Sequence, residues 1–114
     1  TLLGGRFRPK RQDFCGHLAE NALKQLHFTK CFLGTDAIEP DRGFTTTDFD
    51  TARLNEEVIR VSCKSYVLAD REKFDKSSLT PYAGPKEIKG IVTDTAISPD
   101  KKSLFQKAGF MFLS

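Results

Sequence analysis

Residues 29–74 read TKCFLGTDAIEPDRGFTTTDFDTARLNEEVIRVSCKSYVLADREKF, and this stretch decides the fold. An apolar run at residues 31–33 is followed by a polar loop over residues 35–47. A helix is predicted over residues 49–63, and a second apolar run occupies residues 66–69. Both runs are too short for helices, so they indicate buried strands. A strand, a loop, a helix and a strand in this order predict a βαβ unit whose two strands are parallel.

The two predicted strands end in polar residues. The first is followed by Gly34-Thr35-Asp36, and the second by Asp70-Arg71-Glu72-Lys73. In open α/β sheets, ligands bind beyond the carboxyl ends of the strands. We therefore expect both strand ends to face one crevice, which is the predicted functional site.

The other elements are predicted from hydrophobic spacing and from capping residues. The first is a helix over residues 16–26 with Ala19, Ala22, Leu23 and Leu26 buried, and the second is a strand over residues 88–94. A further helix runs from Ser98-Pro99 to Gly109, with Leu104, Phe105 and Ala108 facing inward. The last element is a strand over residues 110–113. In the helix over residues 49–63, the predicted buried face is Thr51, Leu54, Val58 and Val61. A strand end and a Gly-Gly turn are expected before residue 6, and irregular connections over residues 6–14 and 77–86. This pattern predicts an α/β fold with a mainly parallel sheet and helices on both faces.

The composition fits one small globular domain. The chain has 114 residues and a formal net charge of +3, and its basic residues are scattered except in the run at residues 6–11. A short basic run is usually a solvated loop, so it does not by itself predict a nucleic-acid interface. The chain begins at Thr1 without a methionine, and we expect it to be a fragment of a longer protein.

The three cysteines predict a cytoplasmic protein with reduced thiols, and the two histidines do not predict a metal site. Cys15, Cys31 and Cys63 are an odd number without CxxC spacing, which argues against a disulfide framework and a zinc site. His17 and His27 have no partner at ligand spacing, so no metal site is predicted. The sequence has no signal peptide and no apolar stretch of transmembrane length, so no membrane association is expected.

Two groups of small residues are candidates for ligand contact, and each has a structural alternative. Gly4 and Gly5 either bring backbone amides close to a ligand or form a plain turn. Thr45, Thr46 and Thr47 precede the predicted helix, where they either cap its first turn or bind an anion.

Two charged side chains are further candidates. Glu56 and its neighbour Glu57 lie in the middle of the predicted helix, so only one of them can point toward the crevice. Lys73 either reaches a phosphate group as a point charge or pairs with Asp70 or Asp75 at the surface.

An ordered series of sequence blocks resembles a known family. The blocks are Gly4-Gly5, Gly16-x-Leu18-Ala19, FLGTDAI at residues 32–38, GFTT at residues 43–46, Val67-Leu68-Ala69-Asp70-x-x-Lys73-Phe74 and IVTD at residues 91–94. Together they resemble the C-terminal sensor domain of DeoR-type bacterial transcription regulators over nearly the whole chain. The resemblance implies a sensor for a phosphorylated sugar that is joined to an N-terminal winged helix-turn-helix. It also implies that this DNA-binding domain and the first strands of the sensor are absent from the chain.

That family shares its fold with ribose-5-phosphate isomerase and CoA transferase-like enzymes, which raises the alternative of an enzyme. The isomerase carries an Asp-Gly-Ala-Asp block, and here Leu33 stands at the first acidic position while Asp36 matches the second. Glu56, Asp70 and Lys73 match further positions, but residues 44–47 replace a Lys-Gly-rich loop. Isomerisation requires a carboxylate that moves a proton, which leucine cannot do. The resemblance therefore implies binding without catalysis, with no catalytic residue and no cofactor.

The leading hypothesis is that residues 1–114 form one partial sensor domain for a phosphorylated sugar or polyol. As part of a homo-oligomer, it would control operator DNA binding by the absent domain. Gly4 and Gly5 are expected to lie beside the phosphate, and Gly34, Thr35 and Asp36 to form the floor of the pocket. Thr45, Thr46 and Thr47 are expected to contact the ligand, and Glu56 to bind one of its hydroxyl groups. Asp70 and Lys73 are expected at the end of the second strand, where Lys73 neutralises the phosphate. The alternatives are an isomerase-like enzyme and a module that only mediates oligomerisation. A crevice plugged by Phe44 or Phe74 would favour the oligomerisation module.

Overall fold

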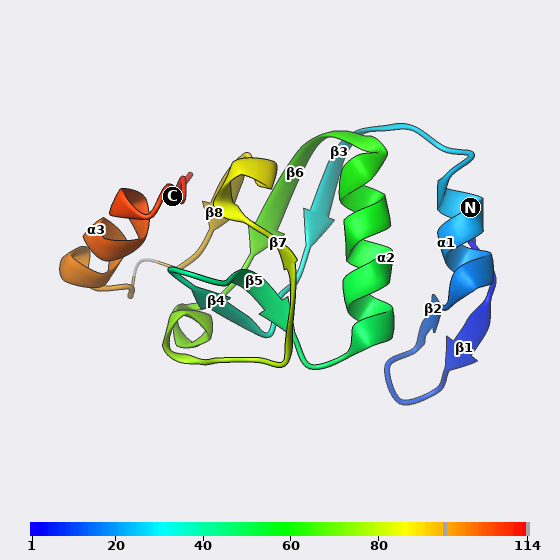
Figure 1. Ribbon diagram of the computed structural model, residues 1–114, viewed down its shortest axis with the longest axis horizontal. Helices are drawn as coiled ribbons and strands as arrows, with labels where there is room; N and C mark the ends of the chain where they lie inside the picture. Colours follow the sequence, from blue (N-terminus) through cyan, green and yellow to red (C-terminus); the bar gives the residue numbers. More distant parts are fainter. Residues whose placement is uncertain (95, 114) are drawn as a thin grey trace.

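The strands on either side of the predicted helix are parallel neighbours, as expected. In β3 (Phe28–Leu33) and β6 (Ser62–Leu68), Leu33 lies opposite Val67. A third strand, β8 (Gly90–Val92), pairs in parallel with β6, so the sheet order is β3-β6-β8 (Figure 1). This computed structural model describes residues 1–94 and 96–113, and it confirms the α/β class with a parallel sheet.

A second, antiparallel sheet was not predicted from the sequence. It consists of β4 (Ala37–Glu39), β5 (Gly43–Thr46) and β7 (Thr80–Ala83), in the order β4-β5-β7. The predictions of a loop over residues 35–47 and an irregular connection over residues 77–86 are therefore wrong. Each strand has only three or four residues, which is too few for a period of two to stand out. Their burial is nevertheless complete at Ala37, Ile38 and Phe44.

The polar connection predicted over residues 6–14 is also wrong, because it forms a hairpin. Strands β1 (Arg6–Arg8) and β2 (Asp13–Cys15) pair antiparallel, with Arg8 opposite Asp13. The rings of Phe7 and Phe14 lie 5.3 Å apart between their centroids. Figure 1 shows this hairpin and α1 at one end of the molecule, beside α2.

The first two helices are shorter than predicted. Helix α1 (His17–Leu23) ends before Leu26, which is 36% exposed, and it packs against α2. Helix α2 (Phe49–Arg60) begins after Asp48, and Cys63 belongs to β6 instead of the helix. The buried residues of α2 are Ala52 and Asn55, so the predicted buried face was rotated by about one residue.

Helix α2 covers one face of the parallel sheet, whereas helices were expected on both faces. Helix α2 contacts both β3 and β6, and Figure 1 shows it beside β3. Strands β3 and β6 expose Phe32 by 60% and Leu68 by 49%. Among the described residues, no helix covers these two side chains.

The core lies between the parallel sheet, the antiparallel sheet and α3 (Pro99–Lys107). Aromatic rings join these layers, because Phe44 contacts Phe110 and Phe105 contacts both Phe74 and Phe110. The predicted N-cap of α3 is confirmed, since Ser98 accepts a hydrogen bond from the Lys101 N–H at 3.2 Å. The inward orientation predicted for Leu104 is wrong, because its side chain is exposed.

The predicted last strand is reduced to a single bridge, in which Phe112 lies parallel to Ile91. Two short 3-10 helices, η1 (Arg71–Asp75) and η2 (Pro85–Glu87), complete the elements. No helix within residues 1–94 and 96–113 is long and apolar enough to cross a membrane.

Candidate functional site

Two cavities meet at Asp36, directly beyond the carboxyl end of β3. The first, here called the lysine cavity, has a volume of about 340 Å³ and is lined by Asp36, Thr47, Lys73, Lys76, Ser77 and Ser78. The second, here called the arginine cavity, has a volume of about 310 Å³ and is lined by Arg11, Gly34, Thr35, Asp36, Thr46, Thr51 and Asn55. The segments that follow β3 and β6 thus contribute to one site, as expected from the parallel pairing.

The carboxylate of Asp36 is fixed by two threonines. Its Oδ2 atom accepts hydrogen bonds from the Thr46 hydroxyl at 2.7 Å, the Thr47 N–H at 2.9 Å and the Thr47 hydroxyl at 3.3 Å. Burial alone would raise the pKa of Asp36, but these hydrogen bonds and the charge of Arg11 together lower it. Asp36 is therefore ionised at neutral pH. No described residue donates to its Oδ1, which can accept hydrogen bonds from a ligand.

The backbone beside Asp36 is held by hydrogen bonds to the antiparallel sheet. The Asp36 N–H donates to the Thr45 carbonyl at 3.1 Å, and the Tyr82 hydroxyl donates to the Gly34 carbonyl at 2.8 Å. Burial raises the pKa of Tyr82 to about 12, so its hydroxyl stays a donor across the physiological range. The unpredicted sheet is thus the support that positions Gly34, Thr35 and Asp36.

The three threonines do not cap α2, which was one of the two alternatives predicted for them. Thr45 and Thr46 belong to β5, and Asp48 is the N-cap residue, accepting from the Thr51 N–H at 3.2 Å. Thr45 is fully buried and lines neither cavity. Thr46 and Thr47 line one cavity each, and both donate to Asp36.

Four other predicted site residues lie outside both cavities. Gly5 packs against α1, where a Cβ atom would come within 2.9 Å of the Cys15 carbonyl, and its neighbour Gly4 is in neither lining. Glu56 is exposed, and the preceding residue Asn55 lines the arginine cavity instead. Asp70 caps η1 by accepting from the Glu72 N–H at 3.0 Å.

Sequence reasoning missed six lining residues, of which Arg11 comes first in the chain. The missed residues are Arg11, Thr51, Asn55, Lys76, Ser77 and Ser78. Arg11 lies in the β1–β2 hairpin, and its Nη1 is 3.3 Å from the Thr51 hydroxyl. The basic run at residues 6–11 was the available signal, but its docking on α2 depends on contacts about 40 residues apart in sequence.

The hairpin is docked by Arg8. Its Nε and Nη2 atoms donate to Asp13 at 2.8 and 2.9 Å, its Nη1 donates to Asp48, and its Nη2 also donates to Thr51 at 3.0 Å. Burial would raise the pKa of Asp48, but hydrogen bonds from Thr51 and Arg8 lower it to about 2. The same residue thus caps α2 and fixes the hairpin that carries Arg11.

The cations at the site differ from most arginines of the chain, because they have no carboxylate partner. Among the described residues, no ion pair involves Arg11, Lys73 or Lys76, whereas Arg6, Arg8, Arg42, Arg53 and Arg60 are each paired. The two cavities therefore combine unneutralised positive charge with one ionised carboxylate and several hydroxyl groups. Such a set of groups can bind a small hydroxylated anion.

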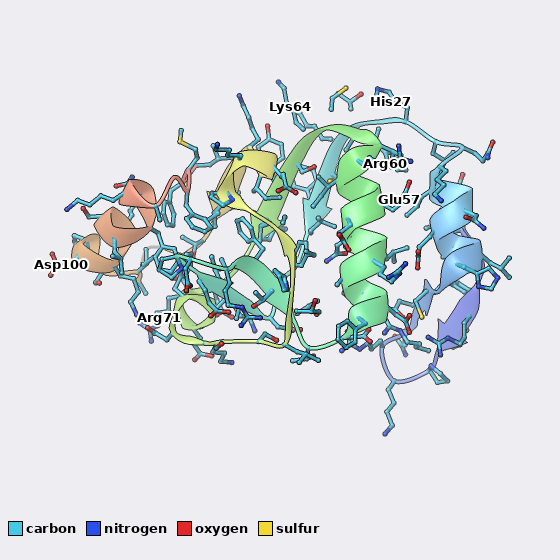
Figure 2. The ribbon with its side chains drawn as sticks, in the orientation of Figure 1. His27, Glu57, Arg60, Lys64, Arg71 and Asp100 are labelled. Atoms are coloured by element: carbon cyan, nitrogen blue, oxygen red, sulfur yellow. The ribbon has the colours of Figure 1, made fainter. Side chains whose placement is uncertain are left out.

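The linings of the two cavities contain no histidine and no cysteine. No group of three His, Cys, Asp or Glu residues within the described part of the chain could hold a metal ion. His27 lies 3.3 Å from the Cys63 sulfur, but Figure 2 shows His27 and Lys64 at the opposite end of the parallel sheet from Arg71 in η1. In the linings of the two cavities, Asp36 is the one carboxylate.

A parallel sheet with polar cavities at its carboxyl end places the chain in the class of α/β domains, and comparisons with known proteins give its family. The family model of the DeoR C terminal sensor domain matches residues 1–95. The putative aga operon transcriptional repressor of Escherichia coli O157:H7 is 38% identical over 108 residues, covering 95% of this chain and 40% of that protein. The HTH-type transcriptional regulator GlpR of Haloferax volcanii is 31% identical over 108 residues, covering 95% of this chain and 42% of that protein.

The chain belongs to the DeoR C-terminal sensor domain family, which confirms the resemblance drawn from the sequence blocks. It spans about two fifths of the length of these relatives. These relatives are transcription regulators by name.

Proposed function

We propose that this chain is the effector-binding part of a DeoR-family transcriptional repressor and that its effector is a phosphorylated sugar. The observation that carries the proposal is the arrangement at Asp36. An ionised carboxylate with a free oxygen lines both cavities, and the cations in the same linings form no ion pair among the described residues. Sugar hydroxyls are donors for the carboxylate oxygen, and a phosphate group matches the cations.

In the whole protein, we propose that a winged helix-turn-helix outside this chain binds operator DNA and that the effector changes its affinity. The relative named the lactose phosphotransferase system repressor in Staphylococcus aureus is 29% identical over 93 residues. Its name joins lactose and a phosphotransferase system to repression, and this supports an analogous role here. The protein would act as a homo-oligomer in the cytoplasm, with the effector favouring one of two conformations.

Neither alternative function gains support from the site. Leu33 packs against the hydrophobic core at the position where an isomerase-like enzyme would need a carboxylate. Phe44 and Phe74 belong to the core and line neither cavity, so the plugged crevice that would favour a pure oligomerisation module is not observed. We therefore propose binding without catalysis.

The test is calorimetric titration of the full-length protein with a panel of sugar phosphates and the corresponding free sugars. We expect at least one sugar phosphate to bind, the free sugar to bind far more weakly, and Asp36→Asn to weaken the binding at least tenfold. Asp41→Asn is the matched control, because Asp41 is exposed in the β4–β5 turn and lines neither cavity. If no sugar phosphate binds, or if both variants bind as the wild type does, the proposal fails.

A further inference from the structure

Both cavities at Asp36 are lined by cationic side chains. Lys73 and Lys76 line one cavity, Arg11 lines the other, and Asp36 lines both. We infer that the effector carries two anionic groups separated by hydroxyl-bearing carbons, with one anionic group in each cavity. This inference rests on the proposed function and names the ligand class of the same site.

The lysine cavity has the groups that a phosphate needs. Lys73 and Lys76 are without an ion-pair partner among the described residues, and the hydroxyls of Ser77 and Ser78 lie in the same lining. The Ser78 Oγ is buried and has no hydrogen-bond partner within the described part of the chain. A buried unpaired hydroxyl destabilises the empty site, and a ligand oxygen can pair with it after a rotation of the side chain.

The wall of the lysine cavity is fixed before any ligand arrives. Arg42 donates to the Ser78 carbonyl at 2.8 Å and to the Leu79 carbonyl at 2.9 Å, and it pairs with Glu39 at 3.1 Å. These contacts join the segment after η1 to the β4–β5 hairpin. Preorganised donors bind an anion more tightly than mobile ones, because less conformational entropy is lost.

The arginine cavity holds a second, separate cation. Arg11 forms no ion pair among the described residues: it donates to the neutral hydroxyl of Thr51 at 3.3 Å, and its charge acts on Asp36 without direct contact. Its hairpin is docked on α2 by Arg8, which keeps Arg11 over the cavity. Asn55, which is 9% exposed, supplies a further polar group in the lining.

Asp36 determines how the two anionic groups are arranged. Its negative charge lines both cavities, so it repels an anion placed beside it and favours anions beside the cations of each cavity. Its free Oδ1 accepts from a hydroxyl group, which belongs in the middle of the ligand. A monophosphate leaves one cationic cavity without its complement, whereas a sugar bisphosphate or a phosphorylated sugar acid fills both.

The test compares matched ligands on the full-length protein by calorimetry. The ligands are the mono- and bisphosphates of glucose, fructose and ribose, together with 6-phosphogluconate. We expect at least one bisphosphate, or 6-phosphogluconate, to bind tenfold or more tightly than its matching monophosphate. Preference for the bisphosphate identifies a second phosphate, and preference for 6-phosphogluconate identifies a carboxylate.

Two variants test which cavity binds which anionic group of the ligand. Arg11→Met should reduce the affinity for the bis-anionic ligand to that of the monophosphate and leave monophosphate binding unchanged, while Lys76→Met should weaken both. Lys10→Met and Lys86→Met are the controls, since both lysines are exposed and line neither cavity. Monophosphates that bind as tightly as their bis-anionic partners, or an Arg11→Met variant that weakens all ligands equally, would overturn the inference and leave the proposed function standing. If no sugar phosphate binds at all, the proposed function itself fails.

Discussion

The two hairpins that flank Asp36 are held in place by different forces. The β4–β5 hairpin is held by burial, because Ala37, Ile38 and Phe44 have no exposed surface. The β1–β2 hairpin is held by charge, because Arg8 joins it to Asp48 while Phe7 remains 52% exposed. Both hairpins contribute to the arginine cavity, one through Thr46 and the other through Arg11.

This difference indicates which half of the site is rigid. Burial of a large aromatic side chain contributes about 2–3 kcal/mol and does not depend on salt or on moderate pH changes. Ion pairs near the surface contribute about 0–1 kcal/mol each and weaken as the ionic strength rises. We therefore expect Asp36 to keep its position under conditions that release Arg11.

The largest expected effect comes from removing the aromatic anchor of the buried hairpin. Phe44→Ala leaves a cavity among Tyr82, Phe110 and their neighbours, so the free energy of unfolding should fall by about 3–5 kcal/mol. Phe7→Ala, in the exposed hairpin, should cost less than about 1 kcal/mol. Urea denaturation of both variants measures the two losses. Equal losses would contradict the contrast between the hairpins.

The next effect concerns the residue that joins the charged hairpin to α2. Asp48→Ala removes the N-cap of the helix and leaves Arg8 without one of its two carboxylate partners. A lost cap costs about 0.5–2 kcal/mol, and the unpaired guanidinium adds to this loss. The control is Asp50→Ala, in the first turn of the same helix, which should cost clearly less. Urea denaturation gives the stability, and a titration with effector shows whether binding weakens together with it.

Stability should also depend on pH through Asp48. Its folded-state pKa of about 2 lies below the ordinary value of 3.8, so its stabilising contribution is complete above about pH 4 and is lost as the pH falls toward 2. The pKa of Asp36 is lowered as well, which acts in the same direction. Between pH 5 and pH 2.5, the Asp48 contribution should fall by on the order of 1–2 kcal/mol. Asp48→Asn should flatten this part of the curve in urea denaturation, and an unchanged slope would show that other carboxylates control it.

The sequence predicted the elements whose signals are local and strong. The apolar runs at residues 31–33 and 66–69 identified β3 and β6, and Asp36 and Lys73 were placed at one site because parallel strands end at the same edge. The antiparallel sheet was missed because its strands are too short for a periodic pattern, even though β5 is rich in threonine.

The missed site residues depend on contacts that no local pattern encodes. Arg11 reaches the site only because Arg8 meets Asp48, 40 residues further along the chain. The error at Glu56 has a different cause, since α2 buries Ala52 and Asn55. A step of one residue turns a helix by about 100°, which moves the side chain at position 56 away from the cavity and Asn55 toward it.

The smallest expected effect is a response of the charged hairpin to salt. Raising sodium chloride from about 0.05 to 0.5 M shortens the Debye length from about 14 to about 4 Å, so the pairs of Arg6 with Asp50 and Arg8 with Asp48 should weaken. Amide hydrogen exchange in β1 and β2 should speed up by about twofold to fivefold, because surface pairs are worth about 0.2–1 kcal/mol. Exchange in β4 and β5 should stay the same, since burial holds that hairpin. Arg8→Gln should make the exchange of β1 and β2 fast and insensitive to salt, whereas a salt response shared by both hairpins would mean that the ion pairs do not set the difference between them.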